Sequence, residues 1–260
     1  MQTITLHDTL VIEPASDRGW RFFCSEPALQ NRDNLVCKAA RALQEYSGRD
    51  LPGAAISLYK AIPSEAGLAG GSSDAAAALK GLNLFWDLNL GLPELLKIGA
   101  SLGSDIPFCL YGGTALVEGR GEKVTALPSL PGCWVVLFTP PGLGCSTAEI
   151  YGAMKKEWFG KPPLELLIRA VQKGDWEMLT SWLELGDTNT LEYPVLNAHR
   201  NLKQLKARLR SSYLAPALSG SGPTLFILTK EYGLARSAAT ALAREGYSVY
   251  LCRTTSGRKE

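Results

Sequence analysis

The chain has 260 residues, which is enough for one large domain or two small ones with a sizeable buried core. Its 27 basic and 25 acidic residues give a net charge of +2, so charge gives no case for binding to nucleic acid or to a membrane surface. The six cysteines and two histidines lack the close pairs that a zinc site requires, and no apolar run reaches the ~18 residues of a membrane span. These features predict a cytoplasmic globular protein with free thiols.

Hydrophobic periodicity and turn residues divide the chain into short strands and amphipathic helices. Residues 1–25 are predicted to form short strands with turn signals at 14–19, and the alternation through residues 9–13 marks one of them. Asp33-Asn34 supplies the N-cap of a helix over residues 35–43. The elements predicted after these are, in chain order, a strand at 54–59, helices at about 73–86 and 93–103, strands at 114–119 and 133–138, helices near 163–173, 176–184 and 202–210, a strand at 225–228, a helix at 231–244 and a strand at 248–251. Because strands and helices mix without repeated βαβ units, the α+β class is predicted.

A run of proline and glycine at residues 128–132 is the best candidate for a domain boundary. It predicts an N-terminal domain over residues 1–130 and a C-terminal domain over residues 131–260. No internal repeat or low-complexity segment interrupts either part.

A glycine-rich loop is the strongest local signal. Residues 63–73 read Pro-Ser-Glu-Ala-Gly-Leu-Ala-Gly-Gly-Ser-Ser and lead directly into an alanine-rich helix. Glycines allow a ligand to approach the backbone closely, and a helix start offers free N–H groups and a positive dipole end. The loop therefore predicts a phosphate site, with a plain structural turn as the alternative interpretation. Its spacing matches neither a Walker A loop nor the dinucleotide fingerprint.

Two further segments accompany this loop. In Leu-Gly-Ser-Asp-Ile-Pro-Phe, Asp105 lies in an otherwise apolar stretch, where loss of solvation can turn a carboxylate into a useful base. In Ser-Gly-Ser-Gly-Pro-Thr, residues 219–224 form a second Gly/Ser turn that leads into a strand. Each segment alone is compatible with an ordinary turn.

Taken together, the three segments resemble the motifs of the GHMP kinase superfamily, and most closely those of its diphosphocytidyl-methylerythritol kinase branch. Flanking pieces share the resemblance: Asn-Arg-Asp-Asn-Leu-Val at 31–36, Lys60, Pro141-Gly142, Ser-Thr-Ala-Glu-Ile-Tyr at 146–151, and Asn-Thr-Leu-Glu at 189–192. The similarity covers nearly the whole chain.

The resemblance implies a ribosomal protein S5-like N-terminal domain and a ferredoxin-like C-terminal domain. It also implies phosphorylation, with ATP as donor, of the tertiary 2-hydroxyl of 4-diphosphocytidyl-2-C-methyl-D-erythritol, a step of non-mevalonate isoprenoid precursor biosynthesis. A Mg²⁺ ion between the β- and γ-phosphates is expected to neutralise charge, with Ser73 as the candidate ligand. No oligomeric state is implied.

Site residues carry over onto the matching positions of this sequence. Asp105 matches the catalytic aspartate. The positions that match the ATP site are Pro63, Ser64, Glu65, Ala66, Gly67, Leu68, Ala69, Gly70, Gly71, Ser72 and Ser73 in the triphosphate loop, with Asn34 and Lys60 around the adenine. The positions assigned to the substrate pocket and the third motif beside it are Thr147, Tyr151, Gly220, Ser221 and Gly222. An aromatic residue at Tyr151 is suited to stacking on cytosine.

The sequence departs from the family pattern at its beginning. Family members carry an Ala-Lys-Ile-Asn-like stretch and a Gly-Tyr-His motif upstream of the position that is Met1 here. We expect the Lys to lie beside the catalytic aspartate and the Tyr and His to contact the cytidine base, so the 260-residue chain as written is expected to be nearly inactive. Two alternatives stay open: another GHMP kinase acting on homoserine, mevalonate or a sugar, and a nucleotide-binding homologue without catalysis.

Overall fold

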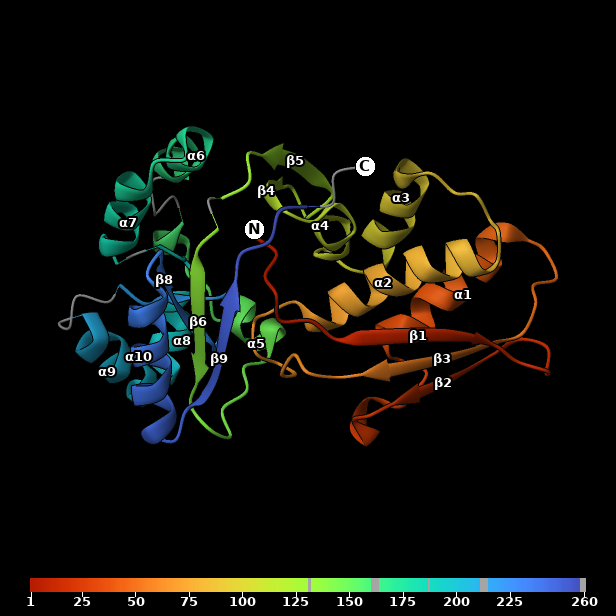
Figure 1. The fold of residues 1–260 in the computed structure, drawn as a ribbon, viewed down its shortest axis with the longest axis horizontal. Helices are drawn as coiled ribbons and strands as arrows, with labels where there is room; N and C mark the ends of the chain where they lie inside the picture. Colours follow the sequence, from red (N-terminus) through yellow and green to blue (C-terminus); the bar gives the residue numbers. More distant parts are fainter. Residues whose placement is uncertain (131, 160–163, 187, 211–214, 258–260) are drawn as a thin grey trace.

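The structure, a computed structural model, describes residues 1–130, 132–159, 164–186, 188–210 and 215–257. Figure 1 shows two halves side by side, with the N-terminal half on the right and the C-terminal half on the left. The elements of the N-terminal half are β1 (Thr9–Pro14), β2 (Trp20–Cys24), α1 (Leu35–Ser47), β3 (Ala54–Tyr59), α2 (Gly70–Phe85), α3 (Leu92–Leu102), α4 (Ile106–Tyr111), β4 (Thr114–Glu118) and β5 (Lys123–Leu127). The elements of the C-terminal half are β6 (Trp134–Thr139), α5 (Thr147–Gly152), α6 (Leu164–Lys173), α7 (Trp176–Glu184), α8 (Glu192–Ala198), α9 (Arg200–Arg210), β7 (Ala217–Leu218), β8 (Leu225–Thr229), α10 (Tyr232–Arg244) and β9 (Ser248–Arg253).

A three-stranded sheet covered by helices forms the core of the N-terminal half. Its order is β1-β3-β2, with β1 antiparallel and β2 parallel to the central β3. Alternate residues of β3 are fully buried (Ala54, Ile56 and Leu58), as the period of two in a strand requires. They pack with α1 and α2, which lie over one face of the sheet in Figure 1.

A four-stranded antiparallel sheet forms the C-terminal half, in the order β7-β8-β6-β9. On one face, Val136 and Phe138 of β6 pack with α10 and α9. On the other face, Val135 and Leu137 pack with Ile4, Leu6 and other partly buried residues. The N-terminal segment of the chain therefore contributes to the core of the C-terminal half.

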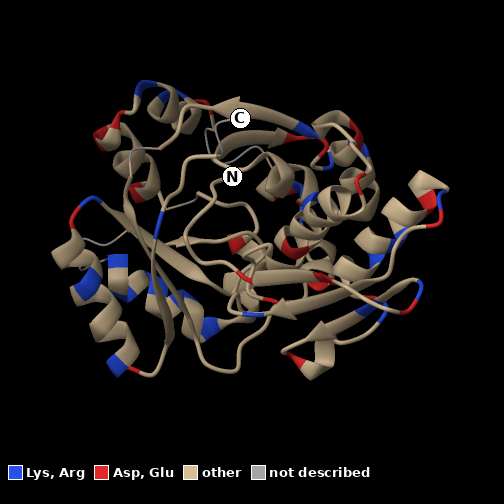
Figure 2. Ribbon diagram, turned by 45° about the vertical axis from the view of Figure 1, so that its right-hand side comes forward, with Lys and Arg blue, Asp and Glu red and all other residues tan. Residues whose placement is uncertain are grey.

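Charge is unevenly distributed along the chain. Figure 2 shows Lys and Arg gathered on the helices of the C-terminal half, and α9 alone carries five basic residues and no acidic one. No helix within the described ranges is both long and apolar enough to cross a membrane.

The α+β class is confirmed, as are most of the predicted elements. The residue pattern predicts the start of α2 near residue 73, but the helix begins at Gly70. The sequence does not predict α4, α5, α8 and β5, which are between five and seven residues long, or β7, which has two residues. Such elements are too short for a period to be recognised, and prolines lie in the first turns of α4 and α8. Pro131 of the predicted boundary run and residue 163, the expected start of α6, lie outside the described residues.

Candidate active site

The glycine-rich loop, residues 63–69, leads into the N-terminus of α2. Ala69 is the N-cap and has a left-handed backbone with φ of 53°. The amide of Ser73 donates the first helical hydrogen bond, to the carbonyl of Ala69, at 2.9 Å. The amides of Gly70, Gly71 and Ser72 precede that bond, so they have no acceptor within the helix. The three N–H groups and the positive end of a 16-residue helix make this the part of the loop best suited to bind phosphate.

The third motif contacts the loop directly. The hydroxyl of Ser219 donates to the carbonyl of Gly67 at 2.8 Å. A Cβ atom at Gly67 would lie 2.3 Å from the carbonyl oxygen of Ser219 and 2.7 Å from the amide nitrogen of Gly222. The structure thus brings together two glycine-rich segments that are 152 residues apart in the sequence.

The predicted substrate residues of α5 lie against the same third motif. The hydroxyls of Thr147 and Ser221 share a hydrogen bond of 2.9 Å. The amide of Cys145, just before α5, donates to the carbonyl of Glu65 in the loop at 3.3 Å. Tyr151, one turn further along α5, is 61% exposed, so its ring is accessible to a ligand. Hydrogen bonds therefore join the loop, the third motif and the start of α5 to one another.

Asp105 is the N-cap residue of α4, and its side chain makes no capping hydrogen bond. Burial raises the pKa of its carboxyl above the ordinary value. The helix α4 packs against α2, and the ammonium of Lys80 on α2 donates to the carbonyl of Leu110 on α4 at 2.5 Å. A surface groove between these two helices is lined by Ser73 at the start of α2 and by Cys109, four residues after Asp105. A carboxylate with a raised pKa thus lies at the start of a helix that packs against α2.

Asn34 and Lys60, which the sequence assigns to the surroundings of the adenine, both have protein partners. The side-chain oxygen of Asn34 caps α1 by accepting from the amide of Val36, and its amide group donates to the carbonyl of Leu29. The ammonium of Lys60 lies 2.6 Å from the carboxylate of Asp8 and 2.7 Å from that of Asp74. The adenine contacts stay a prediction for both residues.

Three polar residues with hydrogen bonds among these segments are not predicted from the sequence. Asp8 and Asp74 bind Lys60, and the side-chain amide of Asn189 donates to the carbonyls of Leu218 and Gly220 at 3.1 and 2.7 Å. Asn189 lies within a segment that resembles the family and Asp74 directly follows one, whereas Asp8 lies in a stretch that reads only as the start of a strand. For Asp8 the sequence holds no signal, because its partners are 52 to 54 residues away.

The comparisons with known proteins show the family to which the chain belongs. The model of the GHMP kinases N terminal domain matches residues 34–113, and that of the GHMP kinases C terminal matches residues 167–248. The chain is 42% identical over 228 residues to a 4-diphosphocytidyl-2-C-methyl-D-erythritol kinase of Listeria monocytogenes, which covers 87% of this chain and 76% of the relative. The chain belongs to the GHMP kinases, in the branch of this relative.

Other GHMP kinases extend the comparison. A second kinase of the same name, from Exiguobacterium sibiricum, is 42% identical over 256 residues, covering 97% of this chain and 87% of the relative. A crystal structure of 4-(cytidine 5'-diphospho)-2C-methyl-D-erythritol kinase superposes with a TM-score of 0.78 at 34% identity, covering 98% of this chain and 88% of the other. The structure of homoserine kinase from Cytophaga hutchinsonii has a TM-score of 0.77 at 17% identity, covering 97% and 87%, so it shares the fold. The predicted two-domain GHMP kinase architecture is confirmed.

Proposed function

We propose that this chain transfers the γ-phosphoryl group of ATP to the 2-hydroxyl of 4-diphosphocytidyl-2-C-methyl-D-erythritol, as a step of non-mevalonate isoprenoid precursor formation. The observation that carries the proposal is the joining of the phosphate loop, the third motif and α5, through the Ser219–Gly67 and Thr147–Ser221 hydrogen bonds. These contacts support an arrangement in which the phosphates of ATP bind at the glycine-rich loop. The acceptor then lies next to them, with its cytidyl end near Tyr151. Six free thiols, five of them buried, fit the reducing cytoplasm in which we place the reaction.

Each group has a defined task in this mechanism. The free amides of Gly70, Gly71 and Ser72 bind phosphate oxygens and stabilise the charge that develops on them during transfer. The carboxylate of Asp105 accepts the proton of the acceptor hydroxyl while its oxygen bonds to the γ-phosphorus. The bond from that phosphorus to the bridging oxygen breaks, and ADP leaves. The raised pKa makes Asp105 a stronger base than an exposed aspartate.

Mg²⁺ is the cation that we propose accompanies ATP. Among the described residues there is no group of three or more His, Cys, Asp or Glu side chains that could hold a metal. The hydroxyl of Ser73 donates to the carbonyl of Gly70 at 2.7 Å, which leaves its oxygen lone pairs able to face a cation. The Ser73 hydroxyl oxygen is a hard ligand of the kind that Mg²⁺ prefers. It fits an ion that is held mostly by phosphate oxygens and water, with Ser73 as one ligand. When bound, the ion neutralises charge on the phosphates.

The replacement Asp105→Asn tests the assignment of the base. It is nearly isosteric but cannot accept the proton, so we expect turnover to fall by about 10²–10⁴-fold while affinity for an ATP analogue is retained. Asp50→Asn is the matched control, because Asp50 is an exposed aspartate of the same domain that pairs with Arg18. A rate for the Asp105→Asn variant within threefold of the parent would show that Asp105 is not the base.

A panel of acceptors tests the substrate. Initial rates with 4-diphosphocytidyl-2-C-methyl-D-erythritol, homoserine, mevalonate and galactose are compared at equal ATP. We expect the cytidyl compound to be phosphorylated at least ~100-fold faster, since a site that hydrogen-bonds one substrate rejects analogues that leave its polar groups unpaired. Preference for another acceptor would contradict the proposal. ATP binding without transfer to any of the four would also contradict it, and would instead support the nearly inactive, nucleotide-binding chain that the sequence leaves open.

A further inference from the structure

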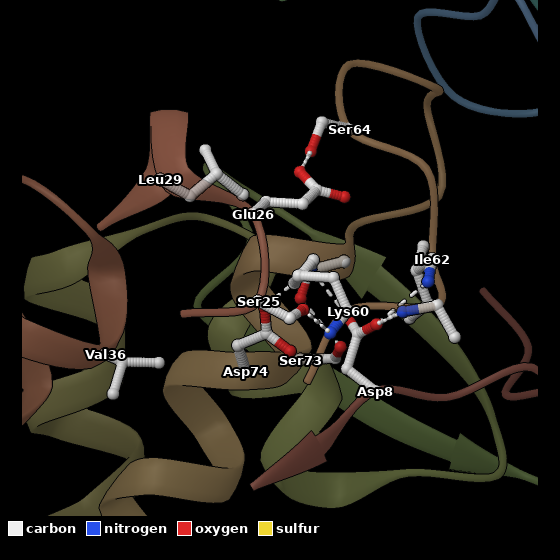
Figure 3. A network of polar contacts seen from close by, with 12 residues as sticks. Asp8, Ser25, Glu26, Leu29, Val36, Lys60, Ile62, Ser64, Ser73 and Asp74 are labelled. Carbon is white, nitrogen blue, oxygen red and sulfur yellow. Dashed lines mark hydrogen bonds and ion pairs between the residues drawn. The ribbon is translucent and has the colours of Figure 1, made fainter. Parts of the chain in front are cut away.

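A buried ion-pair network lies beneath the phosphate loop. Asp8 just before β1, Lys60 just after β3 and Asp74, the fifth residue of α2, have side chains that are only 2%, 3% and 5% exposed. Figure 3 shows their three side chains converging from separate elements. The Lys60 ammonium binds one oxygen of Asp8 at 2.6 Å and one of Asp74 at 2.7 Å.

The second oxygen of Asp8 fixes the backbone where the loop begins. It accepts from the amide of Ala61 at 2.5 Å and from that of Ile62 at 2.8 Å. Lys60 extends the same network to Asp74, one residue after the loop sequence ends. The residues on either side of the loop 63–73 are therefore tied to the same ion-pair network. The carboxylate of Asp8 contacts both the Lys60 ammonium and the two amides that precede the loop.

The protonation of the network is consistent with this arrangement. Burial alone would raise the pKa of Asp8, but hydrogen bonds from Ala61, Lys60 and Ile62 lower it below the ordinary value. Burial alone would lower the pKa of Lys60, but its hydrogen bonds with Asp74 and Asp8 raise it. Asp8 and Lys60 are therefore charged near neutral pH.

Stability alone gives little reason for such a network. Replacing a buried ion pair with apolar residues of similar volume is often neutral or stabilising, because the desolvation penalty of the charges offsets their attraction. Apolar residues cannot accept hydrogen bonds, whereas Asp8 accepts them from two particular backbone amides and from one ammonium. The benefit of the network lies in the geometry that it imposes on the loop.

We propose that Asp8 is a positioning residue that holds the phosphate loop in its ATP-binding conformation without touching the nucleotide. The inference rests on the proposed function for its ligand, ATP. Asp8 fixes the position of Lys60 and of the backbone at residues 61–62. Through them it holds the amides of residues 70–72, at the start of α2, in place to bind phosphate.

The replacement Asp8→Asn tests the proposal. The asparagine oxygen still accepts from the two amides, but its NH₂ group faces the Lys60 ammonium, so the loop loses its charged anchor. We expect the Kd for a non-hydrolysable ATP analogue and the KM for ATP to rise about tenfold or more, as for loss of a charged hydrogen bond. The KM for the cytidyl acceptor stays within twofold and kcat within about threefold. Asp50→Asn, which breaks an exposed ion pair, is the control and leaves all four constants unchanged.

Calorimetry with the ATP analogue separates this inference from the proposed substrate, because it requires no acceptor. A tenfold weaker affinity supports the role of Asp8 even if the cytidyl compound is not phosphorylated. Unchanged affinity in a folded variant overturns it, as does an equal loss in kcat and in both KM values. If Asp8→Asn does not fold, the same titration is done with Asp74→Asn, which removes the charge of the other carboxylate that binds Lys60. Weaker affinity for the ATP analogue then supports the proposal, and unchanged affinity overturns it.

Discussion

Gly67 is the residue at which the glycine-rich loop contacts the third motif, residues 219–224. Its φ is 70°, in the left-handed region that favours glycine, and its carbonyl accepts from Ser219. An added methyl group would overlap the backbone of Ser219 and Gly222, at 2.3 and 2.7 Å. Because the contacting atoms are backbone, they cannot move aside as a flexible side chain would. The loop or the third motif must therefore shift.

We expect Gly67→Ala to lower the free energy of unfolding by about 1–3 kcal/mol and to weaken binding of an ATP analogue. Urea unfolding and calorimetry measure the two effects. Gly233→Ala is the control, since a methyl group on Gly233 of α10 meets nothing within 4 Å and its φ is not in the left-handed region. If Gly67→Ala matches the parent in both measurements, the interlock of the two motifs does not depend on this close approach.

At the scale of residues, the sequence predicts candidate site residues only where they lie together in contiguous stretches. The loop 63–73 could be predicted because glycines, hydroxyls and a helix start occur together, and Asp105 because a carboxylate lies in an apolar stretch. Asp8 could not be predicted, since its amide and ammonium partners come from a turn formed only when β1 and β3 pair. The role of Asp105 and the adenine contacts of Asn34 and Lys60 stay predictions.

At the scale of elements, α2 begins with the amides that we propose bind phosphate, and its fifth residue, Asp74, is a titrating group. Burial raises the pKa of Asp74 to about 7 from the ordinary 3.8, although Lys60 opposes the shift. The folded chain therefore binds this proton more tightly than the unfolded chain does. The stability that results is fully present below about pH 4 and is lost as the pH rises through 7.

Asp74→Asn removes this titration, so we expect it to change the pH profile of stability. The free energy of unfolding of the parent, minus that of the variant, should be larger at pH 5 than at pH 8 by about 1–3 kcal/mol. Urea unfolding at the two pH values gives the difference, with Asp50→Asn as an exposed control. A difference that is the same at both pH values would mean that Asp74 keeps an ordinary pKa in the folded chain.

Element length decides which parts of the fold could be predicted. The long helices α1, α3 and α10 and the buried strands β3 and β6 agree with the sequence to within a few residues, because apolar periods extend over their length. The start of α2 was placed three residues late, since Gly70 and Gly71 are poor helix formers that the tertiary structure nevertheless holds in the first turn. The same turn supplies the free amides of the site.

At the scale of the whole molecule, the two halves are joined around the inner face of the C-terminal sheet. Leu68 of the phosphate loop packs with Val135, Leu137 and Cys252 on that face, beside Ile4 and Leu6. We propose a division near residue 130, because one core lies within residues 24–110 and the main C-terminal core within residues 136–242. The N-terminal segment crosses this division.

Thr114, at the start of β4, is the best place to test whether the halves unfold together. Its side chain is buried, and its hydroxyl donates to the Gln2 side-chain oxygen at 2.5 Å and accepts from the Leu130 amide at 3.2 Å. The Gln2 side-chain amide in turn donates to the carbonyl of Thr255 at 2.8 Å. One hydroxyl thus links the N-terminal segment to β4, to the residues before β6 and, through Gln2, to the segment after β9.

Thr114→Val keeps the shape of the side chain but removes both hydrogen bonds, and it leaves a backbone amide and an amide oxygen without these partners. We expect the free energy of unfolding to fall by about 1–3 kcal/mol, the cost of an unsatisfied buried polar group. Urea unfolding followed by both tryptophan fluorescence and circular dichroism should show one coincident transition in the parent and in the variant, shifted to lower urea in the variant. Thr240→Val is the matched control, because its exposed hydroxyl donates only within α10, to Arg236. Two separate transitions in the parent would contradict the coupling, since the junction at Thr114 would then stabilise one half without the other.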